Sequence, residues 1–304
     1  MKPRRSILSV PGHVLKMHLK AAASAADVVM LDLEDSVPLD AKSQARQQVI
    51  RSLQQISWAS KTMTVRINGL DTAYGYRDLL EVAEAAGGLL TDIVIPKVDH
   101  PRDIHFAARL LDGIEQHTGR EQPLGLEASI ETAAGLQQVA AIADASDRVQ
   151  TLVFGIADYS ASIGARLVSL SGHGEKEETL YPGHRWHFAL SRMVMAGKAR
   201  GLMVIDAPYG NFKDVEGLER SAVMACALGC DGKWAIHPGQ VEPLNRVFSP
   251  SQEDIERAGR VLEAFQQAQG QGRGAIAVDG RMVDQATVRM ARQLWEQARH
   301  LGLV

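Results

Sequence analysis

The chain has 304 residues, of which 45% are hydrophobic and 23% are charged, so it can bury a large core. Its 33 Lys and Arg residues nearly balance its 36 Asp and Glu residues, which leaves a formal net charge of -3. This balance excludes a global attraction to nucleic acid or to a membrane surface. A soluble globular protein is expected.

Short runs rich in Val, Ile and Leu predict eight strands that are buried on both faces. In chain order they span residues 6–10, 28–33, 62–67, 92–96, 124–129, 151–155, 202–206 and 233–236. The intervening segments carry apolar residues at spacings of three and four, which predicts helices at 13–25, 42–55, 101–117, 132–143 and 215–228. The chain therefore alternates strand and helix eight times.

This alternation predicts an α/β protein with a (β/α)8 TIM barrel. A doubly wound open sheet also alternates, but it generally uses fewer strands and a glycine-rich first turn. Pro11 and Gly12, which follow the first predicted strand, do not form a G-x-G-x-x-G fingerprint. The barrel is favoured, and its active site is expected at the carboxyl ends of the strands.

Two regions interrupt the alternation. The first is a polar loop at 171–178, followed by a predicted helix at 181–199. The second follows the eighth strand, where a helix at 251–267 leads into a glycine-rich segment at 270–274, a turn at Asp279-Gly280 and a last helix at 285–298. The glycines predict a flexible joint. We therefore expect a barrel over residues 1–249 and a hinged C-terminal helical lid segment over residues 250–304.

Polar residues close almost every predicted strand, which packing alone does not explain. They are Asp32, Glu34, Asp35, Arg66, Lys97, Asp206 and His237. Two further carboxylates, Glu131 and Asp158, follow the fifth and sixth strands. Two hard oxygen ligands at the ends of neighbouring strands predict a Mg²⁺ site. The alternative is that Glu131 is the acid of a helix N-terminus and Asp158 the acid of a surface turn.

The histidines and cysteines give no comparable signal. His173, His184 and His187 lie in the long insertion without metal-site spacing, which favours surface or capping positions. Cys226 and Cys230 stand four apart in a helical segment and are expected to be small core residues. Neither group predicts a metal site.

The basic residues near the start of the chain are a candidate patch for a polyanionic ligand. They are Lys2, Arg4, Arg5, Lys16 and Lys20, and a solvated surface is the alternative. No secretory signal and no apolar run of the length that spans a bilayer is recognised, so the cytoplasm is the expected location.

Six segments of the sequence carry a family resemblance. They are residues 28–37, 65–69, 95–97, 130–135, 154–158 and 232–238. Their order and spacing, from Leu8 to Met290, resemble the citrate-lyase beta-subunit-like superfamily, the HpcH-like aldolase/citrate lyase family. Within it, the segments are most similar to the malyl-CoA and citramalyl-CoA lyases. Each segment alone is a common pattern, whereas the ordered set is specific.

The resemblance implies a carbon–carbon lyase that depends on Mg²⁺, with Mn²⁺ able to replace it. Such an enzyme reversibly cleaves a 3-hydroxyacyl-CoA thioester, such as malyl-CoA, beta-methylmalyl-CoA or citramalyl-CoA. The products are acetyl-CoA or propionyl-CoA and a 2-oxo acid, glyoxylate or pyruvate, and the reaction passes through an enolate. The resemblance also implies a homotrimer or homohexamer.

The matching motifs imply roles for individual residues. Glu131 and Asp158 would be the metal ligands, and Arg66 would bind the substrate carboxylate and stabilise the enolate. Asp284 would be a mobile acid/base residue carried on the lid of a neighbouring subunit. The alternatives are that Arg66 pairs with a structural acid and that Asp284 caps the last helix.

The CoA thioester and the surroundings of the metal involve further matches. Lys20 matches a lysine near the nucleotide, and Ala157, Asp158, Ile236 and His237 match residues near the substrate. Val14 and Ser9 depart from the family pattern, where an arginine and an aromatic residue are common. Glu34, Asp35, Lys97 and Glu127 would hold metal-bound water or orient Arg66, with structural ion pairing as the alternative.

Two other functions stay open. A barrel that holds a metal and a thioester can direct water at the thioester carbonyl, which would make the chain a malyl-CoA thioesterase. A citrate-lyase-type beta subunit would instead act with an acyl-carrier partner. The long insertion and the C-terminal lid favour a stand-alone enzyme that uses CoA.

Overall fold

The chain folds into two compact units. A computed structural model describes residues 2–59, 61–165, 172–174, 185–270 and 275–304. The first unit spans Arg4–Asn245, and the C-terminal unit contains Arg246–Val304. Within the described ranges, no helix is both long and apolar enough to cross a bilayer.

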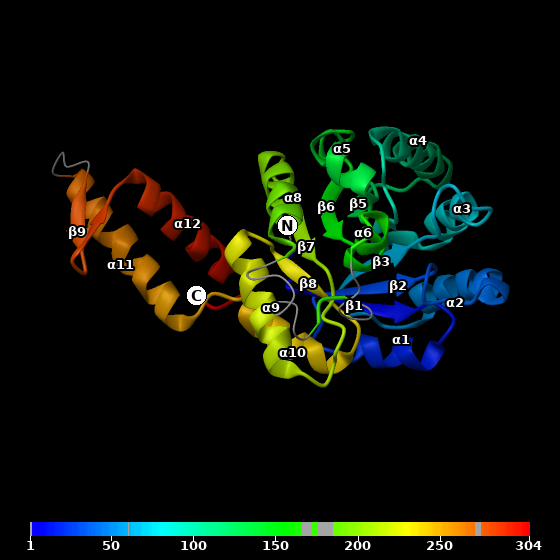
Figure 1. The fold of residues 1–304 in the computed structure, drawn as a ribbon, viewed down its shortest axis with the longest axis horizontal. Coiled ribbons are helices and arrows are strands. Elements are labelled where there is room, and N and C mark those ends of the chain that lie inside the picture. Colours follow the sequence, from blue (N-terminus) through cyan, green and yellow to red (C-terminus); the bar gives the residue numbers. More distant parts are fainter. Residues whose placement is uncertain (1, 60, 166–171, 175–184, 271–274) are drawn as a thin grey trace. The chain divides into compact units, whose positions relative to one another are not determined.

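Strands β1 to β8 of the first unit close into a parallel barrel (Figure 1). They are β1 (Ser6–Pro11), β2 (Val28–Asp32), β3 (Thr62–Arg66), β4 (Leu90–Ile95), β5 (Gly125–Ile130), β6 (Val149–Phe154), β7 (Met203–Asp206) and β8 (Gly232–Ala235). Because β1 pairs with both β2 and β8, the open doubly wound sheet is excluded. The predicted TIM barrel is confirmed, and every predicted strand overlaps an observed one.

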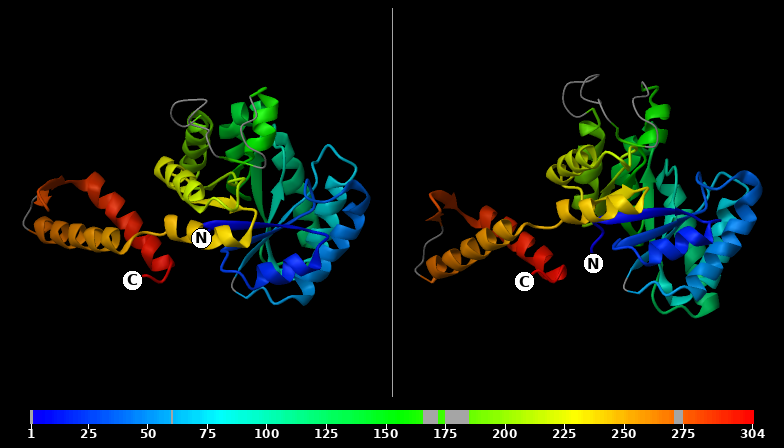
Figure 2. Two further views of the ribbon diagram at one scale, coloured as in Figure 1. Left: turned by 60° about the horizontal axis from the view of Figure 1, so that its bottom comes forward. Right: turned by 90° about the horizontal axis from the view of Figure 1, so that it is seen from below.

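Helices surround the barrel (Figure 2). They are α1 (Leu15–Ala22), α2 (Lys42–Gln55), α3 (Gly75–Ala85), α4 (Pro101–Thr118), α5 (Ala133–Ala143), α6 (Ile156–Ser162), α8 (His187–Ala199), α9 (Val215–Leu228) and α10 (Val241–Val247), with 3-10 turns at Leu39–Ala41, Gly87–Leu89 and Pro238–Gln240. Helix α4 shows how local sequence sets these bounds. Pro101 occupies its first turn behind a His100–Asp103 capping box, and Gly119, at φ 68°, ends it.

The barrel interior is apolar at mid-height and charged below. Ile7, Met30, Val94, Val153 and Trp234 are among the residues of the apolar layer. Beneath it, the guanidinium of Arg4 binds the carboxylates of both Asp92 and Glu127. Arg4 is only 5% exposed, so its predicted place in a basic surface patch is wrong. The neighbouring Arg5 also pairs with a carboxylate, that of Asp27, at 2.7 Å.

A second buried chain of charges lies between the barrel and its helices. Ile205 and Trp234 face the interior, so their neighbours Asp206 and Lys233 face outward. The Asp206 carboxylate lies 2.5 Å from Lys233 Nζ and 3.0 Å from His173 Nε2. His173 is therefore buried and ion-paired, which corrects the predicted surface position.

The other histidines and the cysteines divide in their positions. His187 is exposed at the start of α8, whereas His184 lies outside the described residues. Cys230 is buried as predicted, but Cys226 is exposed on α9, which corrects its expected core position. Within the part of the chain that the structure describes, these residues form no group that could hold a metal ion.

Asp206→Asn is expected to lower the free energy of unfolding by about 3 to 5 kcal/mol, because it leaves the buried Lys233 without its counterion. Burial alone would raise the pKa of Asp206, but His173 and Lys233 hold it well below its usual 3.8. This stabilisation is thus complete above about pH 4 and is lost as the pH falls further. Urea unfolding of both proteins at about pH 7 and pH 3 measures it; a difference below about 1 kcal/mol at pH 7 contradicts the assignment.

The C-terminal unit has its own small core. Helices α11 (Gln252–Gln269) and α12 (Gln285–His300) lie side by side, joined by the hairpin of β9 (Ile276–Val278) and β10 (Arg281–Val283) (Figures 1 and 2). Asp279 and Gly280, at φ 49° and 72°, form the predicted turn. Val261, Phe265 and Val288 pack between the two helices. The interpretation of this unit as a lid stays a prediction.

Candidate active site

The carboxyl ends of β2 to β6 bring most of the predicted polar residues together. Asp32 and Arg66 end β2 and β3, which are paired strands in register at these two residues. Lys97 follows β4, Glu131 follows β5, and Asp158 lies in the first turn of α6, directly after β6. Because β5 pairs with β6, the two predicted metal ligands leave adjacent strands. This is the end of the barrel at which TIM-barrel active sites form.

Glu131 is buried in a cradle formed by its neighbours. It is 2% exposed, and its Oε1 accepts a hydrogen bond of 2.6 Å from the backbone N–H of Lys97. Its Oε2 lies over Gly155, where a Cβ atom would stand only 2.1 Å away. The Glu131 carboxylate therefore fits in this position only because residue 155 has no side chain.

The positive charges near Glu131 do not fully offset the effects of its burial and of the nearby negative charges. Burial, together with the negative charges of Glu34 and Asp158, raises its pKa to about 7, although Arg66 and Lys97 oppose this rise. A divalent cation at this carboxylate would stabilise its ionised form. Asp158 is nearby, because its Oδ2 lies 3.6 Å from Nζ of Lys97, the residue whose backbone N–H binds Glu131.

The donor set fits Mg²⁺. This ion commonly binds one or two carboxylates and keeps several waters, unlike the larger all-protein sites of other metals. Glu131 and Asp158 supply two such oxygen ligands. In the described ranges, no group of three or more His, Cys, Asp or Glu residues is arranged to hold a metal.

Gly155→Ala is expected to weaken Mn²⁺ binding by at least about tenfold, because the added methyl group displaces the Glu131 carboxylate without removing it. Titration followed by the EPR signal of free Mn²⁺ measures the dissociation constant. Gly113→Ala is the matched control, since no atom lies within 4 Å of the added Cβ there. Equal Mn²⁺ affinity in the Gly155 variant and the wild type is the result that contradicts this geometry.

Arg66 is held from three sides. Its Nε and Nη2 donate to the two carboxylate oxygens of Asp32, each at 2.7 Å, and Glu34 lies 3.0 Å from Nη1. Its guanidinium carbon stands 5.4 Å from the ring centroid of Trp234, a cation–π contact. Burial would lower the pKa of Arg66, but Asp32 and Glu34 raise it, so the side chain stays charged. The remaining N–H groups can donate hydrogen bonds to a substrate oxygen.

Three of the four residues predicted to surround the metal site lie together, and the fourth lies elsewhere. The Lys97 ammonium contacts Glu34 at 2.5 Å and Asp35 at 3.7 Å, so these three residues gather beside Asp158. Glu127 does not join them, because it binds Arg4 in the barrel floor. It lies on β5 four residues before Glu131, which directly follows that strand, so the two residues are about 13 Å apart along the chain. The predicted contact of Glu127 with metal water or Arg66 is therefore replaced by an ion pair in the core.

Of the residues predicted near the CoA thioester, Ala157, Ile236 and His237 follow strands β6 and β8 at the carboxyl end of the barrel, whereas Lys20 lies on α1. Ala157 is exposed in the first turn of α6, and Lys20 is exposed in the last turn of α1. The backbone N–H groups of Ile236 and His237 both donate to Gln240 Oε1, which fixes the turn after β8.

Two contacts made by site residues were not predicted from the sequence. Trp234 supports Arg66 from across the barrel, and its signal was an aromatic residue two positions before Ile236 on the interior side of β8. Phe212 stacks on the His237 ring with 4.9 Å between centroids, and no local pattern marks that pair because it joins two loops.

Asp284 lies in the C-terminal unit. It is the N-cap of α12, where its carboxylate accepts hydrogen bonds from the backbone N–H groups of Ala286 and Thr287, each at 3.0 Å. These hydrogen bonds lower the pKa of Asp284. The capping position considered as an alternative is therefore present, and a role in proton transfer stays a prediction.

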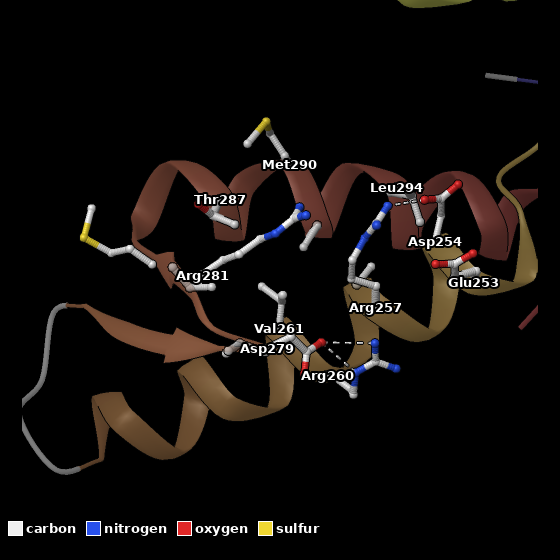
Figure 3. Close-up of a pocket in the computed structure, with 15 residues that line it drawn as sticks. Glu253, Asp254, Arg257, Arg260, Val261, Asp279, Arg281, Thr287, Met290 and Leu294 are labelled. Carbon is white, nitrogen blue, oxygen red and sulfur yellow. Dashed lines mark hydrogen bonds and ion pairs between the residues drawn. The ribbon is translucent and has the colours of Figure 1, made fainter.

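A pocket of about 620 Å³ also lies within the C-terminal unit, between α11, the hairpin and α12 (Figure 3). Its lining combines the side chains of Arg257, Arg260 and Arg281 with those of Met290 and Leu294. Arg257 and Arg260 point toward carboxylates of their own unit, those of Asp254 and Asp279. None of the predicted barrel-site residues lines this pocket.

Two known proteins are similar to this chain over almost its whole length. An L-malyl-CoA/beta-methylmalyl-CoA lyase of Cereibacter sphaeroides is 41% identical over 302 residues, 98% of this chain and 95% of the relative. A (3S)-malyl-CoA thioesterase of the same species is 35% identical, over 97% of this chain and 95% of the relative.

A solved structure and the model of a protein family also match this chain. The structure of CitE from Mycobacterium tuberculosis in complex with magnesium, acetoacetate and coenzyme A is 30% identical, covers 98% of both chains and has a TM-score of 0.77. Residues 5–238 match the profile of the HpcH/HpaI aldolase/citrate lyase family. The chain is therefore a member of the HpcH/HpaI aldolase/citrate lyase family.

Proposed function

We propose that the chain is a Mg²⁺-dependent carbon–carbon lyase that reversibly cleaves a 3-hydroxyacyl-CoA, with malyl-CoA and beta-methylmalyl-CoA as the first candidates. The observation that carries this proposal is that Glu131 and Asp158 follow the paired strands β5 and β6 at the carboxyl end of the barrel, the end at which Arg66 closes β3. A cation site and a fixed guanidinium together suit a substrate that carries a carboxylate and develops negative charge. The 41% identity to a malyl-CoA/beta-methylmalyl-CoA lyase supports the same substrate class.

In this proposal, Glu131 and Asp158 would hold the metal, which as a Lewis acid would lower the pKa of the substrate hydroxyl. A carboxylate near the site removes the hydroxyl proton, the carbon–carbon bond breaks, and its electron pair moves into the thioester enolate. The former hydroxyl oxygen becomes the keto or aldehyde oxygen of the 2-oxo acid. Arg66 offers positive charge that Asp32 and Trp234 already hold in place, so little reorganisation is needed.

Asp284 would complete the reaction by donating a proton to the enolate carbon, which yields acetyl-CoA or propionyl-CoA. In the direction of synthesis it would remove that proton. We propose that Asp284 reaches the site on the lid of a neighbouring subunit in a homotrimer or homohexamer. We also propose contacts of Lys20, Ala157, Ile236 and His237 with the CoA thioester, and the cytoplasm stays the predicted location.

Product analysis tests the lyase proposal. The purified chain is incubated with malyl-CoA, beta-methylmalyl-CoA or citramalyl-CoA, with Mg²⁺ or with excess EDTA. The expected result is metal-dependent formation of acetyl-CoA or propionyl-CoA together with glyoxylate or pyruvate. A 2-oxo acid that forms equally in EDTA contradicts the metal requirement.

The same experiment separates the other candidate functions. The 35% identity to a malyl-CoA thioesterase makes hydrolysis the second candidate, and it predicts free CoA and malate without a 2-oxo acid. No product from any CoA ester would instead favour an acyl-carrier partner, as in a citrate-lyase-type beta subunit. The three candidate functions thus predict three different outcomes of the same assay.

A further inference from the structure

Lys97 has an unusual backbone conformation at the centre of the site. It directly follows Pro96 after β4 and adopts φ 51°, in the left-handed region that residues other than glycine rarely enter. Its N–H donates to Glu131 Oε1 at 2.6 Å, and the N–H of Val98 donates to the carbonyl of Ser129 at 3.1 Å. Two consecutive hydrogen bonds to the β5 segment therefore hold this strained turn in place.

The side chain of Lys97 joins carboxylates from the loop after β2 and from the first turn of α6. Its ammonium lies 2.5 Å from Glu34 Oε1, 3.7 Å from Asp35 Oδ2 and 3.6 Å from Asp158 Oδ2. The loop that carries Glu34 is itself fixed, because Lys42 Nζ donates to the carbonyl of Glu34 at 2.6 Å. To move away from these carboxylates, the Lys97 side chain would have to break its ion pair with Glu34.

One of these three carboxylates is the proposed metal ligand Asp158. A lysine ammonium and a divalent cation are attracted by the same oxygen atoms and repel each other over a few ångströms. The same residue, however, also binds Glu131 through its backbone and so keeps the second ligand in position. Lys97 therefore acts in opposite directions on a bound metal.

We propose that Lys97 is a built-in counter-cation: its ammonium offsets part of the negative charge of Glu34, Asp35 and Asp158 in the metal-free protein and weakens divalent-cation binding, while its strained backbone positions Glu131. This inference rests on the proposed metal site. It makes Lys97 a positioning residue that sets metal affinity, with the backbone and the side chain separable by mutation.

Lys97→Met removes the charge and keeps most of the aliphatic stem. It is expected to bind Mn²⁺ at least about tenfold more tightly than the wild type, because one repelling charge is lost and Asp158 is released. Lys97→Arg keeps the charge and is expected to stay within about threefold of the wild-type affinity. Lys97→Gly removes the charge and relieves the backbone strain, so it provides a second neutral variant if the Met variant does not fold.

Two measurements on the full chain without substrate test the inference. EPR detection of free Mn²⁺ gives the dissociation constant, and thermal unfolding with and without Mg²⁺ gives the shift in Tm. The neutral variants should show a lower Tm than the wild type without metal and a larger rise when metal is added. Unchanged or weaker Mn²⁺ binding in the neutral variants overturns the inference, as does equal tightening in Lys97→Arg.

The outcomes also separate this inference from the proposed function. If the wild type binds Mn²⁺ and forms a 2-oxo acid while the neutral variants bind Mn²⁺ no more tightly, only the role of Lys97 fails. If the wild type binds no Mn²⁺, the metal site fails, and the counter-cation role fails with it.

Discussion

Glu131→Gln is expected to lower metal-dependent turnover by about a thousandfold or more, since the metal contributes several kcal/mol of transition-state stabilisation. The amide keeps the shape of the side chain but loses the negative charge that a divalent cation needs. Mn²⁺ affinity should fall together with turnover. The rate of 2-oxo acid formation at saturating malyl-CoA, with increasing Mg²⁺, measures the effect.

Glu127→Gln is the matched control for this prediction. Glu127 is also a buried glutamate of β5, but its partner is Arg4 rather than the metal cluster. Its replacement should lower the free energy of unfolding while leaving Mn²⁺ affinity near the wild-type value. Retained Mn²⁺ binding and turnover in the Glu131 variant would remove Glu131 from the proposed ligand set.

Asp284→Asn is expected to lower turnover by about a hundredfold to ten thousandfold, with little change in the binding of CoA esters. Asn is as good an N-cap as Asp, so the helix start at α12 should be kept while the ability to exchange a proton is lost. Single-turnover formation of acetyl-CoA from malyl-CoA measures the proton transfer, and equilibrium binding of acetyl-CoA measures the affinity for CoA esters.

Asp284→Ala separates proton transfer from capping. The Ala variant loses the hydrogen bonds to Ala286 and Thr287 as well as the carboxylate, so it should unfold at a lower temperature than the Asn variant. Both variants should be equally slow if Asp284 transfers a proton. If the Asn variant turns over normally and only the Ala variant is slow, the function of Asp284 is to cap α12.

The barrel could be predicted because its signals are local. Runs such as those of β2 and β6 are apolar on both faces, and amphipathic segments separate them, so the order of elements follows from periodicity. The position of Glu131 and Asp158 followed from the same pattern, since residues directly after parallel strands share one end of a barrel.

Two of the errors concern residues whose partners are far away along the chain. Arg4 was expected in a surface patch, yet its partners Asp92 and Glu127 follow it by 88 and 123 residues. His173 was expected at the surface, and Asp206, 33 residues away, holds it in the interior. Burial of a charged side chain depends on whether folding provides its counterion, and no local pattern contains that information.

The sequence by itself determined the alternation of eight strands and helices, the carboxylates that close β5 and β6, and the family of the chain, because each depends on residues close together or on motifs in fixed order. Only the tertiary structure decided which charges are partners. It placed Glu127 under the apolar layer with Arg4, brought Trp234 against Arg66, and set Lys97 between the carboxylates of Glu34 and Asp158. Those contacts arise when the barrel closes, and that closure joins strands from opposite ends of the chain.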